Sequence, residues 1–196
     1  MKWLLLVGFA YLLGSVPCGV VVARLLGQED PRSGGSGNIG ATNVARTVGR
    51  TAGIATLAGD VLKGLIPTAW AGASFVSSWA VAGVGLAAYL GHLFPLYLGF
   101  KGGKGVATGL GVFLGLAPGA ALLAAGVFGG VAWRGRVVSL ASLCAAGVLP
   151  LLLAFLGAPL AYVVLGVVVG GLSVWKHESN IERLLDGTES RLGRAA

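Results

Sequence analysis

Two short segments rich in glycine and polar residues hold the side chains with which this chain could do chemistry. The first is 34–43, where serine, asparagine and threonine lie between the glycines, and the second is 101–105, which carries two lysines. Glycine lets the backbone N–H groups of a loop converge on one point, where they can bind an anion. Lysine and arginine add charge-assisted hydrogen bonds to the same kind of ligand. Both segments are therefore predicted to bind phosphate groups.

Neither segment is a nucleotide-binding motif. Residues 35–40 have the spacing G-x-G-x-x-G, but no predicted strand precedes them and no βαβ unit surrounds them. Residues 101–105 resemble a Walker A loop, yet the spacing is one residue short and Gly105 stands where serine or threonine would bind magnesium. An alternative is that the loops are flexible and basic only for membrane topology. That alternative does not explain why two separate segments are so polar.

A third polar segment, 176–189, follows the last apolar stretch. Ile181 and Leu185 recur in it at helical spacing, so we predict an amphipathic helix at the membrane surface that ends near Gly187. His177 would lie at that surface, level with the two glycine-rich segments. A single surface histidine is usually inert, but beside a phosphate it can bind the anion or donate a proton to it.

The rest of the chain is so apolar that membrane helices must position these segments. Hydrophobic residues make up 56% of the 196 residues and charged residues 11%, with a mean hydropathy of +0.86. This composition predicts one integral-membrane domain, residues 1–196. The net charge of +7 is spread over short connections, which fits anionic ligands and membrane topology and not nucleic acid. Cys18 and Cys144 lie in apolar runs without metal-ligand spacing, and neither a metal nor a cofactor is expected.

We predict an all-α polytopic membrane protein with seven transmembrane helices, five full and two short, and its N-terminus outside. The short helices come from residues 106–133, because the flanking Lys104 and Arg134 are both expected in the cytoplasm and Pro118 provides a turn between them. The alternative that stays open is five spans, with 106–133 as one long helix that breaks the charge rule. The full spans are predicted at 4–26, 51–72, 79–100, 137–155 and 159–175.

Basic residues gather in four segments that we expect on the cytoplasmic side. The connections 72–78 and 156–158 contain none and are expected outside. All three polar segments then fall on the cytoplasmic side. The basic residues are, in chain order, Arg24, Arg32, Arg46 and Arg50, then Lys101 and Lys104, then Arg134 and Arg136, and finally Lys176, Arg183, Arg191 and Arg194.

Most of the 35 glycines are expected in helix packing, because small residues let helices approach closely in lipid. Three pairs are spaced by four residues, as such packing requires. They are Gly111 and Gly115, Gly126 and Gly130, and Gly166 and Gly170.

Ionisable residues inside predicted spans are costly in lipid and are usually paired or functional. Asp60 and Lys63, three residues apart on one helix face, are expected to pair and to support the site. His92 precedes Pro95 near a helix end and is expected to be a hydrogen-bonded helix-end residue. Ser139 and Ser142 could each add a hydroxyl to a phosphate site, and of the two we choose Ser142.

The three polar segments resemble the three signature motifs of the bacterial PlsY family, the acyl-phosphate:glycerol-3-phosphate acyltransferases. The matching residues are 36–46, 99–108 and 177–189, and shorter matches at 60–67, 91–95 and 139–142 extend the similarity along nearly the whole chain. The resemblance implies a seven-helix enzyme of the bacterial inner membrane whose active site faces the cytoplasm. It would transfer a fatty acyl group from acyl phosphate to the 1-hydroxyl of sn-glycerol 3-phosphate, giving lysophosphatidic acid and phosphate. The enzyme that makes acyl phosphate is a candidate protein partner.

The resemblance, which covers Ser36, Arg46, residues 101–105, His177, Asn180 and Glu189, and the chemistry of the other polar residues together predict individual roles. Catalytic roles fall on Ser36, Arg46, Lys104, His177 and Asn180. Substrate binding falls on Gly37, Asn38, Gly40, Thr42, Asn43, Lys101, Gly102, Gly103, Gly105 and Ser142. Structural support falls on Asp60, Lys63, His92 and Glu189. The hydroxyl proton would pass to a substrate phosphate oxygen or to His177, and the sequence leaves both open.

A transporter for a phosphorylated metabolite is the alternative function, since it too would need basic loops broken by glycine. Transporters usually show two related halves and a binding site near the bilayer midplane. This chain shows no internal repeat, and its candidate binding residues fall in loops on one predicted face.

Overall fold

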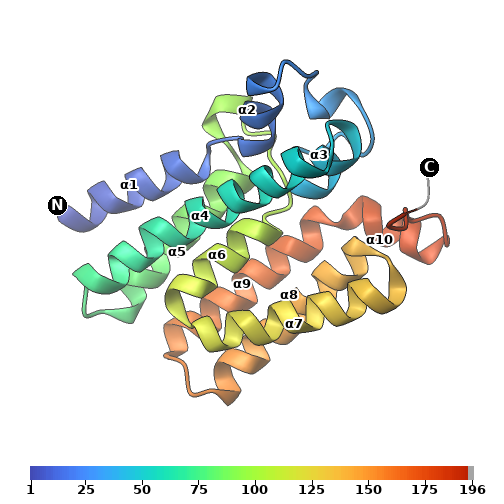
Figure 1. Cartoon of the computed structure of the whole chain (residues 1–196). Helices are drawn as coiled ribbons and strands as arrows, with labels where there is room; N and C mark the ends of the chain where they lie inside the picture. Colours follow the sequence, from blue (N-terminus) through green and yellow to red (C-terminus); the bar gives the residue numbers. More distant parts are fainter. Residues whose placement is uncertain (194–196) are drawn as a thin grey trace. The chain divides into compact units, whose positions relative to one another are not determined.

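The computed structural model describes residues 1–193, and every regular element in this part of the chain is helical (Figure 1). Arg194, counted above among the basic residues of the tail, lies outside the described residues. The ten α-helices are α1 (Lys2–Gly14), α2 (Cys18–Leu25), α3 (Ala41–Thr47), α4 (Arg50–Ser74), α5 (Ser78–Leu93), α6 (Val106–Leu116), α7 (Pro118–Gly135), α8 (Val138–Phe155), α9 (Leu160–Lys176) and α10 (Glu178–Leu185), with two 3₁₀ helices, η1 (Pro31–Ser33) and η2 (Leu96–Leu98).

The chain forms two compact units, Met1–Leu116 with α1 to α6, and the part from Ala117 onward with α7 to α10. The expectation of a single domain stays a prediction. In the first unit α4 is the central helix, because it packs on α1, α2, α3, α5 and α6 (Figure 1). The contact between α4 and α6 depends on small residues. A methyl group at Gly64 would overlap the backbone of Thr108, and one at Gly111 would overlap the carbonyl oxygen of Val61.

The first predicted span, 4–26, is wrong as one continuous helix. α1 ends at Gly14, α2 begins at Cys18, and the two helices are bent by 49°. Pro17 is the physical reason, since it has no N–H to donate and disfavours helical geometry in the residue before it. At this break the carbonyl oxygen of Val16 accepts a hydrogen bond of 2.8 Å from Nζ of Lys63, which belongs to α4.

Residues 106–133 form two helices, so the predicted turn is confirmed and the alternative of one long helix is wrong. α6 ends at Leu116 and α7 begins at Pro118. Ala117 between them has φ −151° and ψ 74°, outside helical geometry. The prediction that both helices are short fits α6, which has 11 residues, but not α7, which has 18. At 1.5 Å per residue these lengths correspond to about 16 Å and about 27 Å.

In the second unit α7 packs on α8, α8 packs on α9, and α10 contacts both α8 and α9 (Figure 1). A methyl group at Gly166 would press on Leu153 of α8, so the packing role of that glycine is confirmed. Gly126 and Gly130 are different, because no atom lies within 4 Å of a methyl group built on either. The prediction that this pair packs against another helix is wrong within the described residues.

The helix predicted after the last span is confirmed as α10, which follows α9 with a bend of 62°. Gly187, two residues beyond it, has φ +71°, the left-handed conformation that commonly terminates a helix. Residues 137–155 and 159–175 match α8 and α9 to within one residue at each end.

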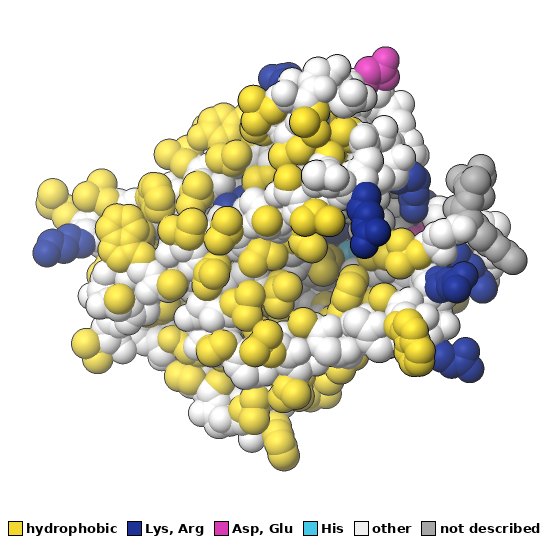
Figure 2. All heavy atoms as spheres, viewed as in Figure 1, with side chains coloured by type: hydrophobic (Ala, Val, Ile, Leu, Met, Phe, Trp, Pro, Cys, Tyr) yellow, Lys and Arg dark blue, Asp and Glu magenta, His cyan; other side chains and the backbone are white. Residues whose placement is uncertain are grey.

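Two helical stretches of the described residues are long and apolar enough to cross a membrane, Ser78–Leu98 and Val138–Phe155. The number rises to four if each bent pair, α1 with α2 and α9 with α10, is one span. Hydrophobic side chains cover much of the face shown in Figure 2. The chain is an all-helical integral membrane protein. Large exposed apolar residues include Ile54, Ile66 and Trp70 on α4, Leu122 and Leu123 on α7, and Leu151 on α8.

Candidate active site

Asn43, in the first turn of α3, holds the first glycine-rich segment in shape. Its side chain is buried. Oδ1 accepts a hydrogen bond from the N–H of Ser36 at 2.8 Å, while Nδ2 donates to the carbonyl oxygens of Pro31 at 2.7 Å and Asn38 at 2.8 Å. Both ends of the amide are therefore engaged inside the segment. This geometry favours a positioning role for Asn43 over the predicted contact with substrate.

Several backbone N–H groups of this segment already donate within it, and the first is that of Ser36, bound to Asn43. The N–H of Gly37 donates to the carbonyl of Gly34, and the N–H of Gly40 donates to Oδ1 of Asn38. The glycines serve the turns. Gly35 and Gly37 have φ of +59° and +66°, which side chains rarely adopt. The exposed side chains of this segment are available for phosphate, and binding by its remaining N–H groups stays a prediction.

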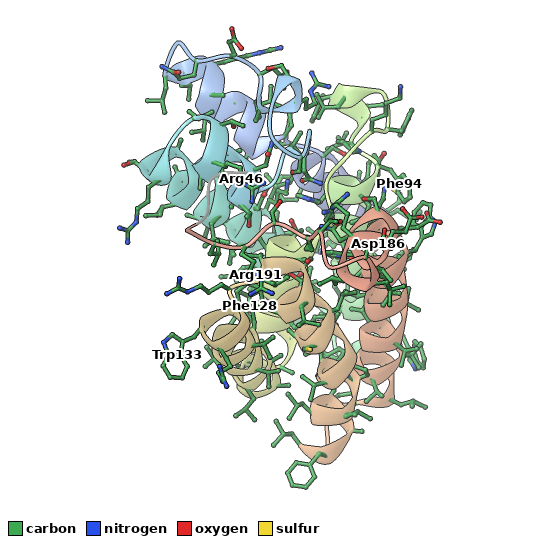
Figure 3. All side chains as sticks on the ribbon, turned by 90° about the vertical axis from the view of Figure 1, so that its right-hand side faces the viewer. Arg46, Phe94, Phe128, Trp133, Asp186 and Arg191 are labelled. Atoms are coloured by element: carbon green, nitrogen blue, oxygen red, sulfur yellow. The ribbon has the colours of Figure 1, made fainter. Side chains whose placement is uncertain are left out.

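Three of the predicted side chains in and just after this segment are exposed, namely those of Ser36, Thr42 and Arg46. Arg46 lies in the last turn of α3 (Figure 3). The hydroxyl of Ser36 is the group it can offer to a ligand, because its N–H already donates to Asn43. A hydroxyl and a guanidinium group are both suited to bind phosphate oxygens.

The second glycine-rich segment lies against the C-terminal end of α5. The N–H of Gly103 donates to the carbonyl oxygen of His92 at 3.2 Å. A methyl group at Gly103 would overlap the imidazole ring of His92, and one at Gly102 would overlap its carbonyl oxygen. These glycines are required because the loop backbone passes so close to α5.

The same segment presents its lysines beside the start of α6. Lys101 is exposed and Lys104 is half-buried. Gly105, with φ +79°, makes the last turn before α6 begins at Val106. The N-terminal N–H groups of a helix carry partial positive charge, which adds to that of the nearby Lys104. This end of the segment therefore favours an anion.

A buried group of charged residues lies behind the second segment. Asp60 and Lys63 form an ion pair of 2.7 Å, with both side chains 3% exposed, so the predicted pairing is confirmed. Nδ1 of His92 lies 3.6 Å from Oδ1 of Asp60. His92 is near a helix end as predicted, and its carbonyl oxygen is hydrogen-bonded to Gly103.

Glu189 is the centre of the third polar segment. Its Oε1 accepts hydrogen bonds from Oγ of Ser139 at 2.7 Å and Nδ2 of Asn180 at 2.6 Å, and its Oε2 accepts one from Nε of Arg183 at 2.7 Å. Burial raises the pKa of Glu189, but these hydrogen bonds and the charge of Arg183 outweigh it and hold the pKa below its usual range. Glu189 thereby ties the residues after α10 to the first turn of α8.

His177 and Asn180 are buried where α9 meets α10, with 2% and 5% of their surface exposed. Nδ1 of His177 lies 2.7 Å from the carbonyl oxygen of Ser173. Because a carbonyl oxygen only accepts, Nδ1 carries the proton, and in the neutral ring Nε2 then carries the lone pair. Nε2 is the nitrogen that could accept a proton.

Sequence reasoning missed Arg183 and considered Ser139 without choosing it, although both contact Glu189. It chose Ser142 instead, but the hydroxyl of Ser142 donates to the carbonyl of Val138 within α8 at 2.9 Å. A signal for Arg183 was present, since its charge is opposite to that of Glu189 and a glycine between them allows the chain to turn back. No comparable signal distinguishes Ser139 from Ser142.

The candidate residues therefore form two groups, one in each unit. The first unit contains the two glycine-rich segments and the buried pair behind the second of them. The second unit contains His177, Asn180 and Glu189, joined to α8 by Ser139.

The chain is similar to glycerol-3-phosphate acyltransferases. Residues 4–187 match the family model with the description glycerol-3-phosphate acyltransferase. A relative with that description from Geobacter sulfurreducens is 51% identical over 189 residues, which cover 96% of each chain. One from Aquifex aeolicus is 47% identical over 192 residues, which cover 97% of this chain and 100% of the relative.

Two crystal structures of PlsY, described as an integral membrane glycerol 3-phosphate acyltransferase, resemble the whole fold. The glycerol 3-phosphate form has a TM-score of 0.95 at 46% identity, and the lysophosphatidic acid form has a TM-score of 0.93 at 45% identity. In both cases the match covers 98% of this chain and 96% of the other.

Proposed function

The chain belongs to the PlsY family of glycerol-3-phosphate acyltransferases, and we propose that it uses acyl phosphate as its acyl donor. The acceptor is sn-glycerol 3-phosphate, acylated at its 1-hydroxyl, and the products are lysophosphatidic acid and phosphate. The observation that carries this proposal is that polar segments match all three motifs of a family whose model covers residues 4–187. The reaction is the first step of phospholipid synthesis.

Arg46, Lys104, His177 and Asn180 hold the phosphate and hydroxyl groups of the acceptor. Arg46 is exposed and Lys104 half-buried, so both can reach a ligand from the surface of the first unit. What supports the roles of His177 and Asn180 is their place in the third motif and their fixed orientation, through Ser173 and Glu189. A donor whose orientation is already fixed loses little entropy when substrate binds.

Ser36 holds the donor through its exposed hydroxyl group. In the reaction the 1-hydroxyl oxygen of glycerol 3-phosphate attacks the carbonyl carbon of acyl phosphate, and the bond from that carbon to the phosphate oxygen breaks. Phosphate leaves with the electron pair of that bond. Because acyl phosphate is already activated, orientation and electrostatic stabilisation account for most of the catalysis. The hydroxyl proton passes to a phosphate oxygen or to Nε2 of His177.

The protein crosses the bacterial inner membrane seven times, with its N-terminus outside and its active site facing the cytoplasm. The distribution of basic residues supports this topology, as does the confirmed break at Ala117. α4 adds a span that hydropathy alone misses, because it contains the charged but paired Asp60 and Lys63. The enzyme that produces acyl phosphate is a candidate partner at the cytoplasmic face.

The proposal is tested by assaying purified protein in lipid with a chelator present. Acyl phosphate and glycerol 3-phosphate together should give lysophosphatidic acid and an equal amount of phosphate, and acyl-CoA should be a poor donor. Acyl transfer from acyl-CoA alone would contradict the donor assignment. In sealed vesicles, uptake of glycerol 3-phosphate without any acyl transfer would favour the transporter alternative.

A further inference from the structure

His92, at the end of α5, lies directly against the second glycine-rich segment. Its carbonyl oxygen accepts the hydrogen bond from the N–H of Gly103 at 3.2 Å, and its imidazole occupies the space where a side chain at Gly103 would begin. The next residue in the chain is Lys104. Two contacts with one histidine, through its backbone and through its ring, therefore define the path of the chain immediately before the lysine.

Asp60 and Lys63 hold the imidazole from the opposite side. Nδ1 of His92 lies 3.6 Å from Oδ1 of Asp60, whose partner Lys63 is 2.7 Å away, and all three side chains are 3% exposed. A charged pair this deeply buried is costly to desolvate and stabilises a fold weakly at best. The presence of this pair in a helix bundle is better explained if the pair orients a neighbouring group.

The same charged pair is attached to a further element of the first unit. Nζ of Lys63 donates to the carbonyl oxygen of Val16, in the break between α1 and α2, at 2.8 Å. Tyr11 adds a second link, because its hydroxyl donates to the carbonyl oxygen of Phe94, just beyond His92, at 2.8 Å. The end of α5 is thus held from α1 and α4, and it cannot shift without breaking buried polar contacts.

We propose that His92 is a positioning residue, held by Asp60 and Lys63, that sets the place of Lys104 for binding of glycerol 3-phosphate. This inference rests on the proposed role of Lys104 in the acceptor site. A displacement of about 1 Å in a group that binds substrate can reduce activity by on the order of a hundredfold. Loss of the His92 contacts should therefore raise the KM for glycerol 3-phosphate far more than the KM for acyl phosphate.

A methyl group added at Gly103 tests the contact with the ring. Gly103 does not have positive φ, so Gly103→Ala does not strain the backbone, and the three atoms nearest to the methyl group all belong to the imidazole of His92. The variant should raise the KM for glycerol 3-phosphate by about tenfold. In a His92→Ala background the ring is absent, and Gly103→Ala should then raise the KM no further than His92→Ala does alone.

Gly102→Ala is the matched control, because its methyl group meets the carbonyl oxygen of His92 and Cδ of Pro95. Both of these atoms remain in the His92→Ala background. The effect of Gly102→Ala should therefore persist there, while the effect of Gly103→Ala disappears. His92→Gln, whose side-chain amide keeps a polar group near Asp60, should recover part of the affinity that His92→Ala loses.

Thermal unfolding in detergent shows that each variant is folded, and steady-state kinetics separate KM from kcat for each substrate. If His92→Ala does not accumulate, the same comparison is made in His92→Gln, whose flexible side chain can move away from a methyl group at residue 103. Equal effects of Gly103→Ala in both backgrounds, or a loss of kcat with unchanged KM, would overturn the inference. If addition of glycerol 3-phosphate caused no phosphate release by the wild-type protein, the proposed function itself would be contradicted.

Discussion

Arg46 and Lys104 are the two basic residues of the first unit that we propose to hold the phosphate group of the acceptor. Replacing either with alanine removes a charge-assisted hydrogen bond, which is worth about 1.5 to 3 kcal/mol. We expect Lys104→Ala and Arg46→Ala to lower kcat/KM by roughly tenfold to more than a hundredfold. The measurement is steady-state release of phosphate from acyl phosphate with glycerol 3-phosphate as acceptor.

Arg50 provides the matched control for Arg46, since it is another exposed arginine, four residues later at the start of α4 and outside the first motif. Arg50→Ala should keep wild-type kinetics. Arg46→Lys should restore activity only in part, because lysine cannot form the two parallel hydrogen bonds of a guanidinium group. Wild-type activity in Lys104→Ala and Arg46→Ala would mean that the two segments do not bind substrate.

Glu189 gives a pH-dependent contribution to stability. Its pKa is lowered in the folded protein, so its contribution is fully present above the unfolded value of about 4.3 and is lost as the pH falls through the folded pKa. Glu189→Gln should therefore unfold at a lower temperature than the wild type at pH 7, and the gap should shrink below about pH 4. Thermal unfolding in detergent at several pH values measures the gap. A gap that stays constant down to about pH 3 would exclude ionisation of Glu189 as its cause.

For individual residues, the sequence shows which residue types cluster along the chain, but it does not show which hydrogen bonds they form. Asn43 matched a binding motif, yet its amide is engaged by Ser36, Pro31 and Asn38. Which side chains of such a loop stay exposed depends on the path of the backbone, and the turns at Gly35 and Gly37 determine that path. The pairing of Asp60 with Lys63 was predictable because it occurs within one helix, where spacing alone brings the residues together.

In the first unit, helices pack closely at positions where glycine leaves no side chain between them. A methyl group at Gly111 would overlap the carbonyl oxygen of Val61, which belongs to the backbone of α4 and cannot rotate away. Gly111→Ala should therefore push α6 from α4 and lower stability by about 1 to 3 kcal/mol. Its measurement is the unfolding temperature of the purified protein in detergent.

Gly126 is the matched control, because it too lies inside an apolar helix and belongs to a pair spaced by four. No atom lies within 4 Å of a methyl group built on it. Gly126→Ala should leave stability unchanged or raise it by up to about 1 kcal/mol through helix propensity. Equal destabilisation by Gly111→Ala and Gly126→Ala would mean that glycine does not act through the contact between α4 and α6.

Helix positions were largely predictable because runs of apolar residues end at charged or helix-breaking ones. The turn before Pro118 was found in this way. The break before Pro17 was missed, although a proline was also present, because the apolar run continues on both sides and has the length of one span. The spacing of glycines by four did not predict packing at Gly126, since the same pattern occurs where a methyl group would have no described atom within 4 Å.

At the scale of the whole molecule, the distribution of basic residues predicts which connections lie on which side of the membrane. The residues proposed to act on substrate come from segments distant in sequence, and each lies beside a helix end that carries basic residues. Because basic connections favour the cytoplasmic side, the proposed seven-span topology would place all of these segments in one compartment. The connection between α4 and α5 contains no basic residue and is expected on the other side.

Single cysteines in a variant with Cys18→Ala and Cys144→Ala test this topology. Gln28→Cys, Gly135→Cys and Thr188→Cys should resist an impermeant thiol reagent in intact cells and react after the membrane is opened. Ser77→Cys, in the connection between α4 and α5, should react in intact cells. Labelling at Gly135→Cys from outside would mean that α6 and α7 do not form two crossings. Labelling at Thr188→Cys would separate the third motif from the other two, and the proposal that all three act on one pair of substrates would then fail.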